Sequence, residues 1–422
     1  MIMNRPLTAE EMKSGRLFYN LYCVVNGLSY NCMGETILIL FALQLGCQDT
    51  VIALLGSMIF VGFLFLPLGK IMTSHTGAVR SQSDFWVLRN IAALMIVGAA
   101  PASAAGYNAA ATGLLLTGAL LFYGFRAAGV VMSQPLVGEI CPSEMRGRFI
   151  ALSWTFFYTT GFISLITISL LTKYHPGIKT LCFVIASGSV IGIISSCFLR
   201  IVKESGEIKK SAAQPIFKEY KKVFKAGVIR RQIYAGTVCY MGLILTMPIS
   251  LLTIKKGFGA TDTQALIFSL IQLFASIPAS FIQSRISDKL GGKIMLLAAH
   301  CSLILTAIYW LIVPGNFSWF ILPLPFLLVA YGNAGINNAL PQYFLQTVSK
   351  ELQVTASIFI SIASGAVAGL LGACLSSILL KISALLNKTS EALVTYRIYF
   401  AIVLLVLLVS TYFIFRLRGK RN

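Results

Sequence analysis

The sequence predicts an all-α integral membrane protein with twelve transmembrane helices in two bundles of six. Hydrophobic residues make up 57% of the 422 residues and charged residues only 11%, whereas a soluble domain is roughly a quarter charged. Apolar runs of about 20 residues, the length that crosses a bilayer as a helix, recur along the whole chain. Runs of this length favour helices over the short alternating segments of a membrane barrel.

Twelve apolar runs carry this prediction. The first 16 residues are polar and the first run is longer than the apolar region of a signal peptide, so we expect it to be a membrane span. The runs lie at 17–46, 51–72, 85–107, 109–140, 149–172, 178–200, 232–254, 265–287, 294–313, 319–345, 354–380 and 396–416.

The basic residues indicate the topology. If the N-terminus is cytoplasmic, 26 of the 34 Lys and Arg residues fall on the cytoplasmic side, seven fall outside and Arg126 falls within a span. This asymmetry is the positive-inside pattern, and an even number of spans returns the C-terminus to the cytoplasm. The net charge of +20 therefore reports topology beside a lipid bilayer, and we expect no nucleic-acid partner.

The longest polar stretch divides the chain in two. Residues 200–231 hold ten basic and three acidic residues, with six predicted spans on either side. We therefore expect an N-terminal six-helix bundle at 1–199, a basic cytoplasmic linker at 200–231 and a C-terminal six-helix bundle at 232–422. The nine cysteines are scattered without metal-binding spacing, so we expect no metal and no cofactor.

A loop motif follows the eighth span. The stretch "SRISDKLGGK" at 284–293 resembles the G-x-L-a-D-r-x-G-r-k loop of the major facilitator superfamily. Its matching positions are Asp288, Lys289, Gly291 and Lys293. In this motif a glycine turn joins two helices, and the acid with its neighbouring bases latches against a helix end in one transport state.

A second motif ends the fourth span. In "GEICPSEMRGR", Glu139, Pro142, Arg146 and Gly147 match the family element E-x-x-P-x-x-x-R-G. The loop after the second span departs from the family, because Thr73 stands where an aspartate is usual. We therefore expect an N-terminal latch that is weaker or built differently, with Asp84 and Arg89 as substitutes.

The resemblance covers nearly the whole chain. It implies a secondary transporter that works by alternating access, with the first, fourth, seventh and tenth spans lining a central cavity. No nucleotide-binding loop and no nucleophile–base pair is found in the sequence, so we expect neither an ATPase nor an enzyme. We expect a monomer in a bacterial-type inner membrane. A membrane enzyme or non-transporting receptor on the same fold is the alternative of another class.

Two charges fall deep in the predicted membrane. Glu35 lies in "YNCMGETILI" of the first span, and Arg126 lies in the fourth. Intramembrane charges are costly and mark functional sites. Three readings stay open: Glu35 carries a proton with Arg126 as its partner, Arg126 binds an anionic substrate group, or the two form a static ion pair. A similar pairing occurs among proton-coupled sugar symporters and proton-linked drug exporters of the family.

Uncharged polar residues complete the predicted binding site. They approach one another at helical spacing in the first span and share a face in the tenth, where amides suit a hydroxyl-rich solute. Hydrogen bonding between helices is the alternative role for such residues. Besides Arg126, the candidates are Tyr22, Asn26, Tyr30, Tyr240, Gln272, Asn333 and Asn337. His300, in the ninth span, is expected to be a packed, hydrogen-bonded residue.

The sequence thus favours proton-coupled movement of a small polar solute: a sugar, a sugar acid or another organic anion. Export of amphipathic drugs or metabolites by proton exchange is the alternative, although the G-P pair of many exporters is absent from the fifth span. Sodium is a further coupling ion to consider, but one buried carboxylate offers few oxygen ligands for it.

Overall fold

The computed structural model describes residues 2–3, 5–131, 133–142, 145–213, 227–347, 358–389 and 391–417. Within these ranges, the side chains at 134, 146–148, 151, 211, 284–289 and 345–347 are not described. Contacts divide the chain into two compact units, which are described separately below. Unit 1 comprises Met1–Gly46 and Gly62–Pro215, and unit 2 comprises Cys47–Val61 and Ile216–Asn422.

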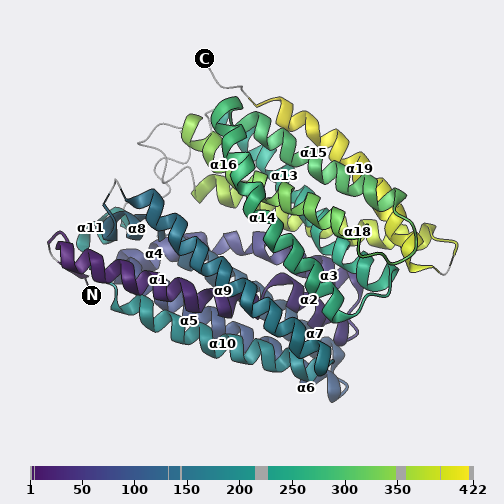
Figure 1. Ribbon diagram of the computed structural model, residues 1–422, viewed down its shortest axis with the longest axis horizontal. Coiled ribbons are helices and arrows are strands. Elements are labelled where there is room, and N and C mark those ends of the chain that lie inside the picture. Colours follow the sequence, from purple (N-terminus) through teal and green to yellow (C-terminus); the bar gives the residue numbers. More distant parts are fainter. Residues whose placement is uncertain are drawn as a thin grey trace. The chain divides into compact units, whose positions relative to one another are not determined.

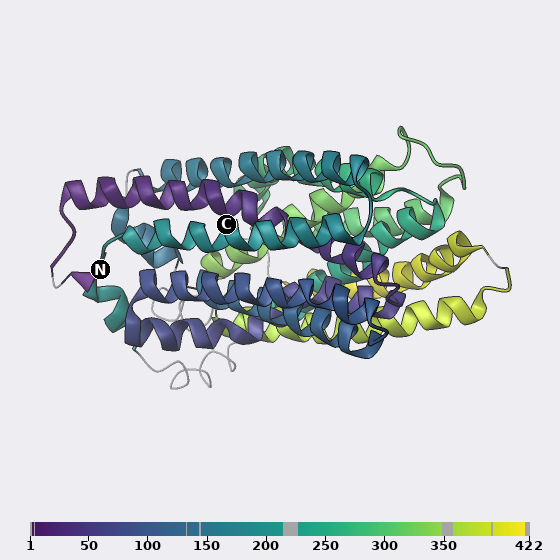
Figure 2. The same cartoon turned by 90° about the horizontal axis from the view of Figure 1, so that it is seen from below.

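Unit 1 is almost entirely helical (Figure 1). Its elements are β1 (Ile2–Met3), α1 (Ala9–Asn31), α2 (Glu35–Gln44), the 3-10 helix η1 (Gly62–Phe65), α4 (Leu66–Thr76), α5 (Ala78–Val97), α6 (Ala99–Ala104), α7 (Asn108–Val130), α8 (Ser133–Ile140), α9 (Arg146–Tyr174), α10 (Ile178–Ile201), β2 (Glu204–Ser205) and α11 (Gly206–Ala212). Strand β1 pairs in parallel with β2 and lies beside α11 at one end of the helices (Figure 2).

Unit 2 is also helical. Its elements are α3 (Asp49–Val61), α13 (Gly227–Leu252), the π-helix η2 (Thr253–Gly257), α14 (Asp262–Leu290), α15 (Gly292–Ile312), α16 (Pro323–Thr347), the π-helix η4 (Ser361–Ala366), α18 (Val367–Leu386) and α19 (Ala392–Phe415). Helix α13 packs against α16, α18 and α19, and α3 packs against α18 and α13. The second predicted span is therefore divided, because η1 and α4 continue it in unit 1.

The described residues contain eleven helices that are long and apolar enough to cross a membrane. They coincide with eleven of the predicted runs. The run at 319–345 coincides with α16, which is not among the eleven. The all-helical membrane fold is thus confirmed, whereas the count of twelve spans and the cytoplasmic side of the termini stay predictions.

The first span is broken, which the apolar run at 17–46 does not predict. Helix α1 ends at Asn31, and α2 starts at Glu35 after an N-cap at Gly34 that has an extended conformation (φ −65°, ψ 166°). Chain breaks inside the membrane are typical of transporters, because unwound backbone there can line a binding site.

Close helix contacts hold unit 1 together around α1, which packs against α9 and α10. A Cβ atom on Gly27 would lie 2.4 Å from the carbonyl oxygen of Phe157, so glycine permits this approach of α1 to α9. On the α10 side, the Ser29 hydroxyl donates a hydrogen bond of 2.8 Å to the Gly188 carbonyl. Close packing at small residues and hydrogen bonds from hydroxyl groups commonly stabilise contacts between membrane helices. These contacts hold the broken first span against α9 and α10.

Candidate functional site

The break in the first span places Glu35 at the first position of α2, where the side chain is half-buried. The first amides of a helix have no partner in the helix and carry a partial positive charge, which stabilises a carboxylate nearby. Glu35 also lies close enough to Tyr123 of α7 for an electrostatic interaction. The carboxyl group therefore sits at a half-helix end, between the first and fourth predicted spans.

Arg126 of α7 is half-buried and rests on an aromatic ring. Its guanidinium carbon lies 5.0 Å from the centre of the Tyr30 ring of α1. Six ion pairs join described residues, and none includes Arg126 or Glu35. The ion pairs of the described residues thus do not include one between the two predicted charges, and a direct contact between them stays a prediction.

A third charge, Arg89 of α5, is fully buried in unit 1. Its Nη2 atom donates a 2.9 Å hydrogen bond to Oδ1 of Asn26, and its Nε atom has no partner. Its guanidinium carbon lies 4.4 Å from the Trp86 ring centre and 5.4 Å from that of Phe122. Arg89 thus adds a buried charge that the sequence analysis does not place beside Glu35 and Arg126, and its role as a substitute latch stays a prediction.

The two arginines belong to one group of stacked aromatic and guanidinium side chains, which we call the arginine ladder. Its members are Arg126, Tyr30, Phe122, Arg89 and Trp86. The Tyr30 and Phe122 rings are stacked with centres 6.4 Å apart and planes at 19°. Arg126 lies over Tyr30, whereas Arg89 lies between Phe122 and Trp86. The two guanidinium groups are close enough to repel each other. The ladder therefore concentrates positive charge in the interior of unit 1.

The contacts compensate the two charges unequally. A central arginine costs about 2.5–3.5 kcal/mol in a membrane helix. A cation–π contact returns about 0.5–2 kcal/mol, and a hydrogen bond to a charged group about 1.5–3 kcal/mol. Two rings and one hydrogen bond can offset the cost for Arg89. Arg126 has one ring contact and no ion pair among the described residues, so its positive charge is left without a paired carboxylate.

Tyr22 and Asn26 form hydrogen bonds with Trp86 and Arg89, two buried members of the arginine ladder. Both are buried, with 5% and 6% of their surfaces exposed. The Trp86 indole donates a 2.6 Å hydrogen bond to the Tyr22 hydroxyl, and the Asn26 amide donates a longer one of 3.4 Å to the same oxygen. The predicted polar residues of the first span thus contact Arg89 and Trp86, and their role as ligand contacts stays a prediction.

The remaining predicted ligand contacts lie in unit 2. The Asn337 amide is exposed and donates to Oδ1 of Asn333 over 2.8 Å, so the two residues share a face of α16 as expected. The Tyr240 ring packs against Phe60 of α3 with ring centres 5.1 Å apart. Gln272 is half-buried on α14. These residues offer hydrogen bonds and no charge.

Three residues of the predicted latches, Arg146, Asp288 and Lys289, have side chains that lie outside the described part of the structure. At the other latch positions, Gly291 has φ +86° before α15, and the Lys293 amine donates to the Phe415 carbonyl over 2.8 Å. Positive φ is the conformation that favours glycine at this turn.

Two carboxylates, Glu204 and Glu139, make hydrogen bonds near the predicted loop that contains Thr73, and a differently built latch there stays a prediction. The Glu204 carboxylate accepts backbone hydrogen bonds from Ala78 (2.7 Å) and Val79 (3.3 Å) at the start of α5. Glu139 accepts from both the amide and the hydroxyl of Ser205. Two carboxylates from other elements thus occupy positions around this helix end.

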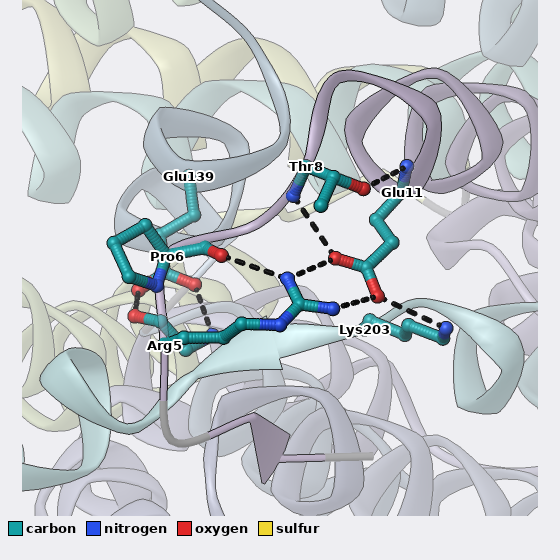
Figure 3. A network of polar contacts seen from close by, with 7 residues as sticks. Arg5, Pro6, Thr8, Glu11, Glu139 and Lys203 are labelled. Atoms are coloured by element: carbon teal, nitrogen blue, oxygen red, sulfur yellow. Dashed lines mark hydrogen bonds and ion pairs between the residues drawn. The ribbon is translucent and has the colours of Figure 1, made fainter.

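The N-terminal segment adds a second cluster of charge at the same end of unit 1 (Figure 3). The Glu11 carboxylate accepts a forked pair of bonds from Arg5, of 2.8 and 3.0 Å, and lies 3.2 Å from the Lys203 amine. Asp84 pairs with Arg80 and Arg200, and its role as a substitute latch stays a prediction. No cluster of three metal-binding side chains occurs among the residues the structure describes.

The comparisons with known proteins cover nearly the whole chain. The family model of the Major Facilitator Superfamily matches residues 21–373, and no curated protein sequence matches. A structure of a point mutant of the nucleoside transporter NupG has a TM-score of 0.75 at 12% identity, covering 94% of this chain and 99% of that one. A structure of the xylose transporter XylE from E. coli in a partially occluded inward-open conformation has a TM-score of 0.67 at 14% identity, covering 98% of this chain and 99% of that one. A D-xylose-proton symporter has a TM-score of 0.69 at 15% identity, with 97% and 98% covered.

Proposed function

Because the chain belongs to the Major Facilitator Superfamily, and is therefore a transporter rather than an enzyme, we propose that it moves a small polar solute by proton-coupled alternating access. The solute class is a sugar, a sugar acid or another organic anion. The observation that carries the proposal is Glu35, a half-buried carboxyl at the end of a broken membrane helix with no ion pair among the described residues.

A carboxyl group in this position is suited to exchange a proton. The positive end of α2 stabilises the charged form, and a surrounding of low polarity stabilises the neutral form. These two effects oppose each other, so a modest change near Glu35 transfers the proton. Rearrangement of Tyr123 or arrival of a charged solute would be such a change.

Family and fold support the remaining parts of the proposal. Alternating access is the general mechanism of secondary transporters built from two bundles. Two of the similar structures are sugar and nucleoside transporters, and one is described as a proton symporter. The positive-inside pattern of the sequence supports an inner-membrane location with cytoplasmic termini.

The experiment uses purified protein in liposomes that contain a pH-sensitive dye. Sugars, sugar acids, organic anions and cationic drugs are added in turn to wild type, Glu35→Gln and Glu10→Gln. Glu10 is an exposed carboxylate and provides the matched control. We expect one solute class to move protons in wild type and Glu10→Gln, and Glu35→Gln to lose this coupling.

Two other results would lead elsewhere. If cationic drugs alone move protons, and in the direction opposite to the drug, the chain is an exporter. If labelled solute crosses equally in all three proteins without proton movement, Glu35 is structural and the coupling proposal fails.

A further inference from the structure

We propose that the solute carries a negative charge and that Arg126 binds its anionic group. Arg89 does not contact the solute in this proposal but orients the neighbouring side chains and adds positive potential. This inference rests on the proposed function and narrows its solute class. It assigns to Arg89 a role that the sequence does not indicate. The anionic group is a carboxylate or a phosphate, since both match the forked donors of a guanidinium.

The charge balance of the arginine ladder favours an anion. Two guanidinium groups lie in it, and no ion pair among described residues includes either. Glu35 and Arg126 both interact with Tyr123, so one carboxyl belongs to the same neighbourhood. Arg89, Arg126 and Glu35 together therefore have a net charge of +1 when Glu35 is ionised and +2 when Glu35 is protonated. A neutral sugar would leave this excess charge uncompensated, whereas an anion compensates it.

The two arginines differ in burial, and this difference separates their roles. Arg126 is half-buried, makes one ring contact and forms none of the ion pairs among the described residues. Arg89 is fully buried between two rings and bonded to Asn26. Arg126 is consequently the contact residue. Arg89 is a positioning residue that orients Asn26 and adds positive potential behind the Tyr30–Phe122 pair.

Proton binding and anion binding favour each other at this site. Glu35 and Arg126 both act on Tyr123, so protonation of Glu35 removes a negative charge from the surroundings of this site, which strengthens the attraction of Arg126 for an anion. By linkage, a bound anion strengthens proton binding to Glu35 by the same factor. Proton and anion therefore bind together and travel in the same direction. Couplings between sites in one protein are typically about 5- to 150-fold, and we expect roughly tenfold or more here.

The test compares three probes that share a hexose ring: glucose, glucuronate and glucose 6-phosphate. Binding to the purified full-length protein is followed by tryptophan fluorescence at pH 6 and pH 8, since Trp86 contacts Arg89 directly. The variants are Arg126→Gln, Arg126→Lys, Arg89→Lys and Glu35→Gln. Arg416→Gln is the matched control, because it removes an arginine that lies 4.8 Å from the Tyr412 ring at an exposed site.

We expect at least one anionic probe to bind at least tenfold more tightly than glucose, and more tightly at pH 6 than at pH 8. Arg126→Gln should lose this preference, and Arg126→Lys and Arg89→Lys should keep part of it. Glu35→Gln should bind glucuronate, whose charge is the same at pH 6 and pH 8, equally tightly at both pH values. The two anionic probes distinguish a carboxylate site from a phosphate site. Size-exclusion profiles identify a variant that fails to fold, and the lysine variants then carry the test.

Two results would overturn the inference: neither anion binds, or Arg126→Gln binds anions as tightly as wild type. Failure of the proposed function gives a different result. Anion binding that depends on Arg126 without any proton movement in liposomes would keep the inference and reject proton coupling. If glucose alone drives proton movement, and the arginine variants do not change it, proton coupling is kept and the inference of an anionic solute is rejected.

Discussion

The two units treat polarity in opposite ways. Unit 1 buries the charged side chains of Lys70, Arg89 and Glu204, whereas no Asp, Glu, Lys or Arg among the described residues of unit 2 is buried. Unit 2 places its ion pairs at helix ends, where Asp49 bonds to Lys256 and to the Tyr396 hydroxyl. Its buried polar groups are neutral, such as Ser250, which accepts from the Trp310 indole over 2.9 Å.

This difference indicates a division of roles. A buried charge is expensive and changes its surroundings when a proton or an ion arrives, so it suits energy coupling. A neutral hydrogen bond is inexpensive and indifferent to pH, so it suits packing and recognition of hydroxyl groups. We therefore assign the ion-dependent steps to unit 1, and the predictions below test that assignment.

The largest effect is expected for Glu35→Gln. The amide keeps the shape of the side chain at the start of α2 but cannot carry a proton. Accumulation of solute against its gradient should be lost entirely, because a proton gradient can no longer drive uptake when no proton travels with the solute. Exchange of labelled solute at equal concentrations should persist. Liposome uptake with and without an imposed pH gradient checks both statements, and loss of exchange as well would indicate a structural residue.

Arg89→Met should separate function from stability. The variant removes a buried charge and keeps a long apolar side chain between Trp86 and Phe122. Replacing a buried charge by an apolar residue is often neutral or stabilising, so the melting temperature in detergent should not fall. Uptake of the anionic solute should fall at least tenfold. A lower melting temperature with normal uptake would show that Arg89 serves packing alone.

Gly77→Ala tests the helix end that holds Glu204. Gly77 has φ +87°, and an added Cβ atom would lie 2.3 Å from Oε1 of Glu204. The strained backbone and the displaced carboxylate should destabilise unit 1 by about 1–3 kcal/mol. Thermal unfolding in detergent measures this. The control is Gly113→Ala, at a helical glycine where nothing lies within 4 Å of an added Cβ, and an equal effect of both would contradict the prediction.

In unit 2, Tyr399→Phe should cost about 1 kcal/mol of stability and leave transport unchanged. The hydroxyl bonds to the Leu245 carbonyl over 3.0 Å and to Ser376 over 2.9 Å, and all these groups are neutral. The pH profile of uptake should therefore match that of wild type. A shifted profile would show that coupling extends into unit 2 and would break the comparison between the units.

The smallest effect is the pH dependence due to Glu204, outside the membrane spans. Burial raises the pKa of this carboxyl above its ordinary value of 4.5, and the bonds from Ala78 and Val79 counteract this in part. The folded state therefore keeps the proton at pH values where the unfolded chain has lost it. Stability should fall as the pH rises from 4.5 through the raised pKa, and then level off. The melting temperature of Glu204→Gln should therefore depend less on pH in this range than that of wild type. An equal pH dependence in both proteins would contradict the assignment to Glu204.

The fold could be predicted from the sequence because membrane helices leave a direct signal. Long apolar runs place the spans, and two loop motifs indicate the family from the residue pattern alone. His300 is an instance at residue level: its position in a peripheral span predicts a packed residue, and its Nε2 atom is 3.0 Å from the Leu407 carbonyl oxygen. The break at Gly34 has no such signal, because apolar residues continue on both sides of it.

The candidate site could be predicted only in part. Glu35 and Arg126 stand out as charges in apolar runs, but Arg89 lies near the polar start of the third span and looks like an interfacial residue. Its burial depends on Trp86, which precedes it by three residues, and on Phe122 from another helix. The sequence holds one clue to it: aromatic residues at helical spacing from an arginine in a span can shield its charge.

The most direct test of proton-coupled anion transport uses the anionic probe that binds more tightly, glucuronate or glucose 6-phosphate. Its labelled form is followed as it accumulates in liposomes under an imposed inward proton gradient, with wild type beside Glu35→Gln. We predict that wild type concentrates the anion above the outside level and that Glu35→Gln only equilibrates it. Equal accumulation by both proteins would contradict this mechanism, because the proton would then be carried by a group other than the carboxyl at the break of the first span.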